Sequence, residues 1–258
     1  RSLAGCDAGP TWTRIGAIGF SVRSIVFHGS QGVVAAFSES GMFYSGDGGN
    51  QWAKTTSPLG KPRTVTVSGN NVFFAGTEEN GIYSSNDNGV TWTQANKEPL
   101  QINALQIDRL DATLLWIGAN AGVWSFNTVN GRFVENKAGL TGKALEVWGF
   151  AVDAANIYIA TSDGVYKGKG TDTWQPFGRQ GSQINSLEIV DNYLYAGAKP
   201  ASAGAIGGVW RTPLDGANWT AVTSSGWNET NTVRDLLYEP TYCKGLLAAT
   251  DDGIWVYR

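Results

Sequence analysis

The sequence predicts an all-β fold in which one four-stranded unit is repeated six times. A glycine followed by one apolar and then one aromatic residue recurs as Gly41-Met42-Phe43, Gly81-Ile82-Tyr83, Gly122-Val123-Trp124, Gly164-Val165-Tyr166, Gly208-Val209-Trp210 and Gly253-Ile254-Trp255. Successive glycines are 40, 41, 42, 44 and 45 residues apart, which is the length of one blade of a β-propeller. We therefore expect a single six-bladed propeller domain over residues 1–258.

Each repeat supplies four antiparallel strands, A to D. Strand A is the β-rich run at 22–27, 62–67, 102–107, 147–152, 184–189 and 233–238. Strand B lies at 33–37, 72–76, 114–118, 157–161, 193–197 and 246–250, and strand C begins at each signature glycine. Strand D opens on an aromatic residue 10 or 11 positions after the glycine, at Trp52, Trp92, Phe133, Trp174 and Trp219.

The last repeat ends at Arg258, before its strand D aromatic. The missing residue is found at the other end of the chain, in Thr11-Trp12-Thr13-Arg14. We expect this N-terminal strand to pair with residues 253–257 and close the last blade, because closure removes the exposed sheet edges of an open array.

Closure would bring the two cysteines together. Cys6 precedes the closing strand, and Cys243 lies in the A–B turn of the same blade, at the same end. A disulfide here would close a loop of nearly the whole chain, worth about 5 kcal/mol in the loop-entropy model. It implies a secreted protein or another oxidising extracytoplasmic compartment, such as the periplasm or a lumen. The alternative is two free, unrelated thiols.

Composition excludes several classes of function. With 42% hydrophobic residues, 16% charged residues and a net charge of −3, the chain is neither disordered nor a coiled coil. One histidine and two cysteines cannot supply the four ligands of a closed zinc site. His28 is expected in an A–B turn, away from the candidate face, which argues against triad catalysis.

Cofactors and several partners are also not expected. The sequence has no phosphate-binding glycine loop, and its basic residues are scattered, so we expect no nucleotide cofactor, no metal and no nucleic-acid partner. No apolar run reaches the roughly 20 residues of a membrane span, and Arg1-Ser2 does not begin a signal peptide, so any targeting segment is expected to have been removed. We expect a monomer.

Two turns match the pattern S-x-D-x-G-x-x-W one repeat apart. Their residues are Ser45, Asp47, Gly49 and Trp52 in the first turn, and Ser85, Asp87, Gly89 and Trp92 in the second. This pattern resembles the Asp-box, or BNR, repeat of sialidase-like propellers, which include sialidases, other glycosidases, sortilin-type receptors, Ycf48-type assembly factors and lectins. The resemblance implies that these turns are structural and lie opposite the ligand-binding face.

That opposite face is built from the B–C turns and the D-to-A crossings. One equivalent strand A position holds Arg23, Arg63, Asn103, Trp148, Asn185 and Arg234. The three arginines, in consecutive blades, could hold an anion; alternatively they pair with acids such as Asp235, Glu39 or Glu78. Aromatic residues in the crossings, Phe20, Phe177 and Trp227, could contact a ligand or pack between blades.

Three classes of function remain open. The first is a non-catalytic recognition or assembly module that binds a protein or another ligand on this face, and the second is a glycan-binding lectin. The third is a sialidase-like hydrolase, in which Glu146 and Glu229 would be the candidate acids, although the expected FRIP-type motif is absent. The fold alone does not choose among them.

Overall fold

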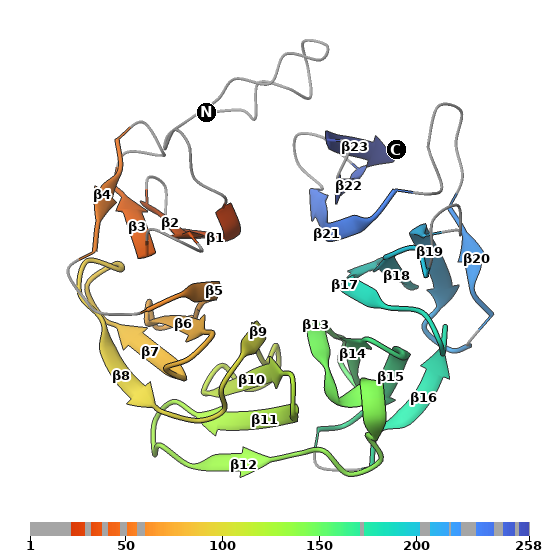
Figure 1. Cartoon of the computed structure of the whole chain (residues 1–258), viewed down its shortest axis with the longest axis horizontal. Helices are drawn as coiled ribbons and strands as arrows, with labels where there is room; N and C mark the ends of the chain where they lie inside the picture. Colours follow the sequence, from red (N-terminus) through yellow and green to blue (C-terminus); the bar gives the residue numbers. More distant parts are fainter. Residues whose placement is uncertain are drawn as a thin grey trace. The chain divides into compact units, whose positions relative to one another are not determined.

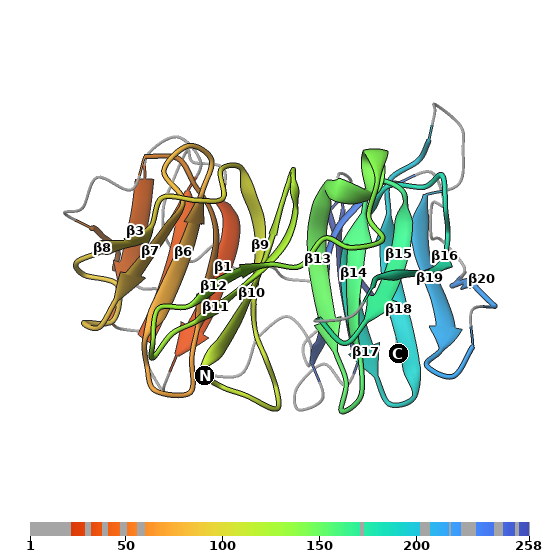
Figure 2. The ribbon, with the colours of Figure 1, turned by 90° about the horizontal axis from the view of Figure 1, so that it is seen from below.

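The computed structural model describes residues 22–28, 32–37, 41–46, 51–55, 60–170, 173–201, 207–216, 218–222, 231–239, 245–250 and 253–257. The described chain consists of antiparallel sheets, with strands side by side in sequence order (Figures 1 and 2). It divides into two compact units, one with strands β1 to β12 and the other with β13 to β23. The all-β prediction is therefore confirmed.

The first unit contains three four-stranded sheets. Its strands are β1 (Val22–His28), β2 (Gly32–Phe37), β3 (Gly41–Ser45), β4 (Ala53–Lys54), β5 (Pro62–Val67), β6 (Phe73–Thr77), β7 (Ile82–Ser85), β8 (Thr93–Asn96), β9 (Ile102–Ile107), β10 (Leu114–Ala119), β11 (Gly122–Asn127) and β12 (Phe133–Glu135). The first strand of each sheet packs on the first strand of the next, β1 on β5 and β5 on β9.

The second unit contains two four-stranded sheets and, among its described residues, a three-stranded one. Its elements are the 3-10 helix η1 (Gly142–Leu145) and strands β13 (Val147–Val152), β14 (Ile157–Thr161), β15 (Gly164–Gly168), β16 (Gln175–Gly178), β17 (Ile184–Val190), β18 (Tyr193–Ala198), β19 (Gly208–Pro213), β20 (Thr220–Ala221), β21 (Val233–Glu239), β22 (Gly245–Thr250) and β23 (Gly253–Tyr257). Here β13 packs on β17, and β17 on β21.

Apolar second strands form the core between neighbouring sheets. All five residues of β6 are buried, and Phe74 packs with Ile102 and Leu105 of the next sheet. Gly76 permits this approach, because a Cβ there would lie 2.4 Å from Cγ2 of Ile102. Gly197 has the same role in the second unit, where a Cβ would lie 2.5 Å from Cγ1 of Val233.

Several predictions fall on parts of the chain that the structure does not describe. The closing strand with Trp12, and both Cys6 and Cys243, lie outside the described residues. The same is true of Asp47, Gly49, Trp227 and Glu229.

Candidate functional site

A β-bulge occupies the same place in all six described sheets. The register between the first and second strands skips one residue near the start of each first strand. The skipped residues are Arg23, Arg63, Asn103, Trp148, Asn185 and Arg234. They are the six residues that sequence alignment of the repeats places at one equivalent position. A bulge leaves its residue outside the ladder and re-aims the side chain.

The residues before and after the bulge are buried in the core, whereas the side chain of the bulge residue between them is only partly buried. Pro62 and Thr64 are buried and pair with Thr77 and Gly76 of β6, whereas the Arg63 side chain between them is 19% exposed. The same buried, half-buried, buried order begins β9 and β17. Polar or charged residues can therefore occupy this position without entering the apolar layer between sheets.

Each bulge residue lies in a recurring group of three positions, which we call the bulge triplet. It comprises the residue before the first strand, the bulge residue, and the residue that follows the second strand. In four sheets the triplets are Lys61, Arg63 and Glu78; Gln101, Asn103 and Asn120; Glu146, Trp148 and Ser162; and Gln183, Asn185 and Lys199. A backbone hydrogen bond joins the third position to the first in each, at 3.0, 3.3, 3.1 and 2.9 Å.

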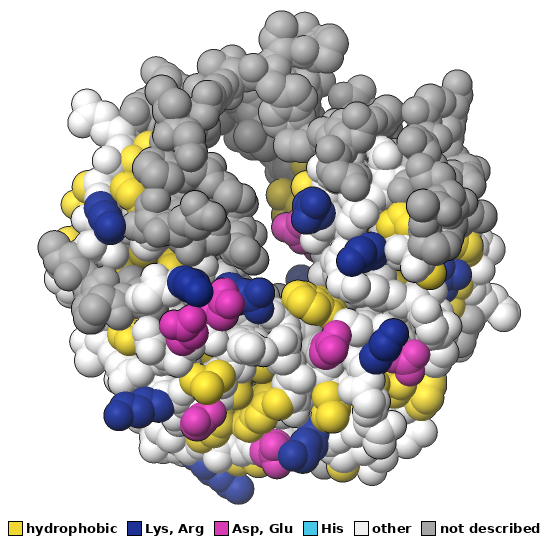
Figure 3. Space-filling model, in the orientation of Figure 1, with side chains coloured by type: hydrophobic (Ala, Val, Ile, Leu, Met, Phe, Trp, Pro, Cys, Tyr) yellow, Lys and Arg dark blue, Asp and Glu magenta, His cyan; other side chains and the backbone are white. Residues whose placement is uncertain are grey.

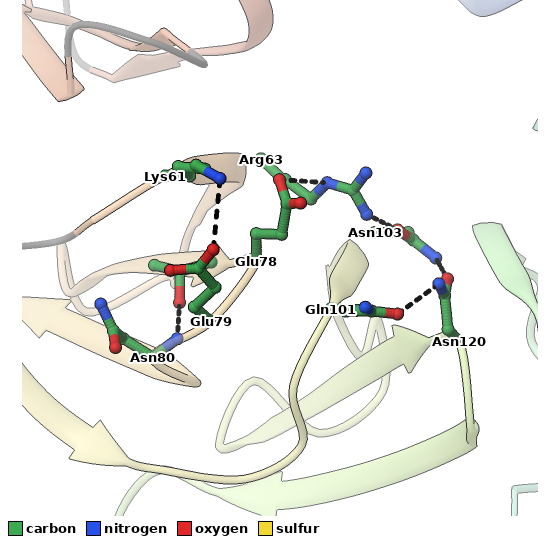
Figure 4. Close-up of polar contacts among 9 residues, drawn as sticks. Lys61, Arg63, Glu78, Glu79, Asn80, Gln101, Asn103 and Asn120 are labelled. Carbon is green, nitrogen blue, oxygen red and sulfur yellow. Dashed lines mark hydrogen bonds and ion pairs between the residues drawn. The ribbon is translucent and has the colours of Figure 1, made fainter.

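Arg63 connects the triplets of two neighbouring sheets (Figure 4). Its Nη1 donates to Oδ1 of Asn103 at 2.5 Å, and its Nε lies 3.8 Å from the carboxylate of Glu78. Beside it, Nζ of Lys61 contacts Glu79 at 3.2 Å. Figure 3 shows basic and acidic side chains next to one another over β5 and β6. The charge of Arg63 is thus partly balanced within its own sheet, as the ion-pair alternative expects.

A chain of side-chain amides continues from Arg63. Asn103 Nδ2 donates to Oδ1 of Asn120 at 2.7 Å, and Asn120 Nδ2 donates to Oε1 of Gln101 at 2.6 Å (Figure 4). Asn120 and Gln101 are exposed. An amide carries two donors and two acceptor lone pairs, so this row can still bond a polar ligand without losing its internal contacts.

In the first sheet of the second unit, β13 to β16, the bulge residue is aromatic. Trp148 Nε1 donates to Oγ of Ser162 at 2.8 Å, and the Ser162 hydroxyl donates to Oε2 of Glu146 at 2.6 Å. All three side chains are half-buried. The serine therefore fixes the indole and the carboxylate beside each other at the end of the sheet that holds the B–C turn.

The next two sheets are joined by backbone as well as side-chain groups. Asn185 accepts from Gln183 Nε2 at 3.0 Å and donates to the carbonyl of Val233 at 2.7 Å. Ser186 accepts from the amide of Leu236 at 3.0 Å and donates to Asp235 at 2.9 Å. These bonds satisfy groups on a first strand that, as a sheet edge, has no ladder partner on that side.

Asp235 lies in this junction. Desolvation by the surrounding protein raises the pKa of Asp235, and the hydrogen bonds from Ser186 and the Leu236 amide act in the opposite direction. The side chain nevertheless exposes a large part of its surface, so solvent offsets much of the desolvation. Its contacts identify it as a residue that joins two sheets.

Of the three predicted arginines, the structure brings Arg63 together with Asn103. Arg234 is exposed in β21, in the other unit, and the described part of Arg23 is its backbone in β1. The prediction that Phe177 lies in a crossing between sheets is wrong. Phe177 is buried in β16, where it packs against Tyr158 and Trp219. His28 ends β1, as expected for a residue at the A–B turn.

The turn at residues 85–92 lies at the opposite end of its sheet and is closed by local bonds. Asp87 accepts from the Thr91 amide at 2.8 Å, and Ser85 Oγ accepts from the Gly89 amide at 2.9 Å. Trp92 Nε1 donates to the Gly89 carbonyl at 2.9 Å and the indole is buried. In the earlier turn, Ser45 is buried and Trp52 half-buried. These contacts give the second turn a structural explanation.

Two kinds of site are absent from the described part of the chain. It contains no group of three His, Cys, Asp or Glu side chains arranged to hold a metal ion. It also contains no helix long and apolar enough to cross a membrane.

The chain is similar to several solved structures, although no protein-family model and no curated protein matches its sequence. The extracellular domain of BT4673 from B. thetaiotaomicron has a TM-score of 0.74 and 16% identity, covering 95% of this chain and 32% of that one. A GH74 xyloglucanase from Xanthomonas campestris has a TM-score of 0.72 and 17% identity, covering 97% and 43%. Ycf48 bound to D1 peptide has a TM-score of 0.68 and 13% identity, covering 95% and 81%.

At these identities, the similarities carry the fold alone. The chain spans about a third of the BT4673 domain and less than half of the xyloglucanase. The matched proteins include both enzymes and binding proteins, so they do not choose a function. What they share with this chain, together with its antiparallel four-stranded sheets, is the β-propeller fold.

Proposed function

We propose that the chain is a non-catalytic recognition or assembly module that binds a protein segment at the end of its sheets that holds the bulge triplets. The observation that carries this proposal is the β-bulge repeated in every described sheet, at which arginine, asparagine and tryptophan alternate on the same scaffold. Variation at a fixed position is what a recognition surface requires, since specificity comes from the side chains and affinity from a rigid support.

The chemistry of the triplets suits an extended peptide. The amides of Gln101, Asn103 and Asn120 offer donors and acceptors, as a peptide backbone does. Within the four described triplets, Ser162 has the one hydroxyl group that contacts a carboxylate, that of Glu146. The same hydroxyl accepts a hydrogen bond from Trp148, so the role of Ser162 is to support the indole. The similarity to Ycf48, whose structure contains a bound peptide, supports the same class of ligand.

A random-peptide library displayed on phage, panned against the immobilised chain, tests this function. We expect binders that lose about tenfold in affinity with Asn103→Ala, the worth of about one hydrogen bond to a ligand. Arg132→Ala is the matched control, because Arg132 is exposed in the turn at the opposite end of the same sheet. Equal losses in both variants, or binders that need Arg132, would contradict the proposed surface.

A lectin is the second candidate, and one observation favours it. The fixed indole of Trp148 beside the Glu146 carboxylate combines an aromatic face with hydrogen-bond acceptors, as sugar rings require. Binding to an immobilised-glycan array that disappears with Trp148→Ala and survives in Arg132→Ala would favour it over peptide recognition. Turnover of a fluorogenic sialoside that is lost in Arg63→Ala and Arg234→Ala would instead indicate the hydrolase.

The finer features of the fold belong to the same proposal. We propose six blades, with the segment 11–14 completing the last one, a disulfide between Cys6 and Cys243, and Asp-box turns at 45–52 and 85–92. The sixth described sheet has three strands, to which this segment would add a fourth. An extracytoplasmic location is in line with the extracellular domain among the similar structures.

A further inference from the structure

Arg179 lies immediately after β16. Figure 1 shows the chain segment that leads from β16 to β17. Its backbone has a φ of +63°, a conformation that is uncommon for a residue with a side chain. Gly164 lies against it, and a Cβ at Gly164 would be 2.7 Å from the Arg179 carbonyl carbon. The Arg179 carbonyl also accepts from the Ser182 amide at 3.0 Å. The backbone of Arg179 is therefore fixed in an unusual conformation.

The side chain of Arg179 is positioned by a tryptophan of the next sheet. Its guanidinium carbon lies 3.6 Å from the centroid of the Trp210 ring, which places the cation directly against the indole. Trp210 is itself oriented, because its Nε1 donates to the Gly207 carbonyl at 2.7 Å. Both side chains are half-buried.

The guanidinium has no acceptor among the residues that the structure describes. Its Nε is buried without a hydrogen-bond partner, and no ion pair to Arg179 occurs in the described part of the chain. Asp163 lies beside Gly164, and its carboxylate accepts hydrogen bonds from the Gly181 amide at 2.9 Å and from the Tyr166 hydroxyl at 3.2 Å. Burial lowers the pKa of Arg179, although a guanidinium remains protonated at neutral pH.

A half-buried cation without a carboxylate is unusual, because desolvated charges are normally paired. Stacking on Trp210 uses one face of the guanidinium and none of its N–H groups, and these N–H groups are the donors that bind a carboxylate. We propose that Arg179 and Trp210 form a site for an acidic side chain, Asp or Glu, of a partner protein. This inference rests on the proposed recognition function and names the chemistry of the partner.

The location of this site agrees with that function. Arg179 contacts Gly164, which is the first residue after the B–C turn of its sheet. In the next sheet, Gly207 ends the B–C turn, and Trp210 follows it by three residues, in β19. The site is thus at the end of the sheets that holds the bulge triplets. Arginine and tryptophan are also the residues that most often dominate the binding energy of protein interfaces.

The first test uses N-acetyl-aspartate N-methylamide as the probe and the indole ¹⁵N–¹H resonance of Trp210 as the readout, assigned by its loss in Trp210→Phe. At constant ionic strength we expect a saturable shift with this probe and none with the isosteric asparagine compound. Arg179→Gln should abolish the shift, and Arg179→Lys should weaken binding severalfold, because lysine keeps the charge but loses the planar stack. Lys169→Ala, at an exposed lysine in the turn at the other end of the fourth sheet, should leave it unchanged.

Identical shifts with the acid and the amide, no shift with either, or an unchanged shift in Arg179→Gln would each overturn the site. The second test compares peptides selected from the phage library on the original chain and on Arg179→Gln. Enrichment of Asp or Glu that is lost in the variant supports the acidic partner, whereas selection without acidic enrichment overturns it. If instead no peptide is selected while the probe still binds, the recognition of protein segments fails and the carboxylate site stands alone.

Discussion

Replacing Gly81 by alanine tests why every repeat has a glycine at, or immediately before, the start of its third strand. Gly81 has a φ of +71°, and a Cβ there would lie 2.3 Å from the carbonyl oxygen of Asn96 and 2.5 Å from the carbonyl carbon of Lys97. Both are backbone atoms at the end of β8, so no side-chain rotation relieves the contact. Gly131 is a matched control, because its φ is +72° and nothing lies within 4 Å of its Cβ position.

The two substitutions share one cost and differ in another. Placing alanine in the left-handed region costs about 1–2 kcal/mol, of which about 0.4–1 kcal/mol is offset because alanine also restricts the unfolded chain. Gly131→Ala should therefore lower the free energy of unfolding by roughly 0–1.6 kcal/mol. Gly81→Ala must also displace backbone, and forced overpacking costs a further 1–3 kcal/mol or so.

Urea unfolding followed by tryptophan fluorescence measures both variants on the same scale. We expect Gly81→Ala to have the lower midpoint by an amount that corresponds to about 1–3 kcal/mol. If the two variants unfold at the same urea concentration, the close approach of β8 is not what selects glycine, and the backbone conformation alone accounts for it.

Three further predictions concern the scaffold. Trp174→Ala should lower the free energy of unfolding by about 3–5 kcal/mol in the same assay, since Trp174 is 1% exposed and packs on Gly168; a loss below 1 kcal/mol would contradict this core position. Partial desolvation raises the pKa of Asp87, but hydrogen bonds from Thr91 and Ser85 outweigh it and lower the pKa. The stability that this carboxylate adds is thus complete at neutral pH and is lost as the pH falls below about 4, so Asp87→Ala should lower the midpoint at pH 7 and flatten its acid dependence; a parallel acid profile would refute this reasoning. Intact mass after alkylation, with and without reduction, should reveal no free thiol in the native protein, and two alkylated cysteines would remove the argument for an oxidising compartment.

The repeat was predictable from the sequence because its signature has a local physical cause. Gly81 and Gly164 both have positive φ, and both lie against the end of a fourth strand, so other residues are disfavoured at these positions. Strand periodicity and the buried aromatic residues Trp92 and Trp174 then follow at fixed distances. The strands of the described repeats accordingly fall close to their expected bounds.

The contacts of the site could not be predicted in the same way. Aligning the repeats finds the position of Arg63 and Asn103, but a bulge has no residue-type signature, and the hydrogen bond between them joins two sheets. The prediction for Phe177 is wrong because it places this residue in a crossing, whereas Phe177 is the third residue of the fourth strand β16. Trp210 is the aromatic residue of a repeat signature, but Arg179, 31 positions earlier, belongs to no motif, so only the fold shows that the two side chains meet.

The bulges suggest how one scaffold can carry different ligands. Val147 and Ile184, which precede the bulges of two neighbouring sheets, are both fully buried, whereas the next residue is tryptophan in one sheet and asparagine in the other. Because the bulge residue lies outside the ladder, exchanging its side chain removes no ladder hydrogen bond and little apolar contact between sheets. Arg179 is different, since its backbone conformation depends on Gly164 and its side chain on Trp210. On the proposed recognition function, substitutions at the bulges should therefore alter which ligand binds, whereas substitutions around Arg179 should alter whether a charged group is held at all.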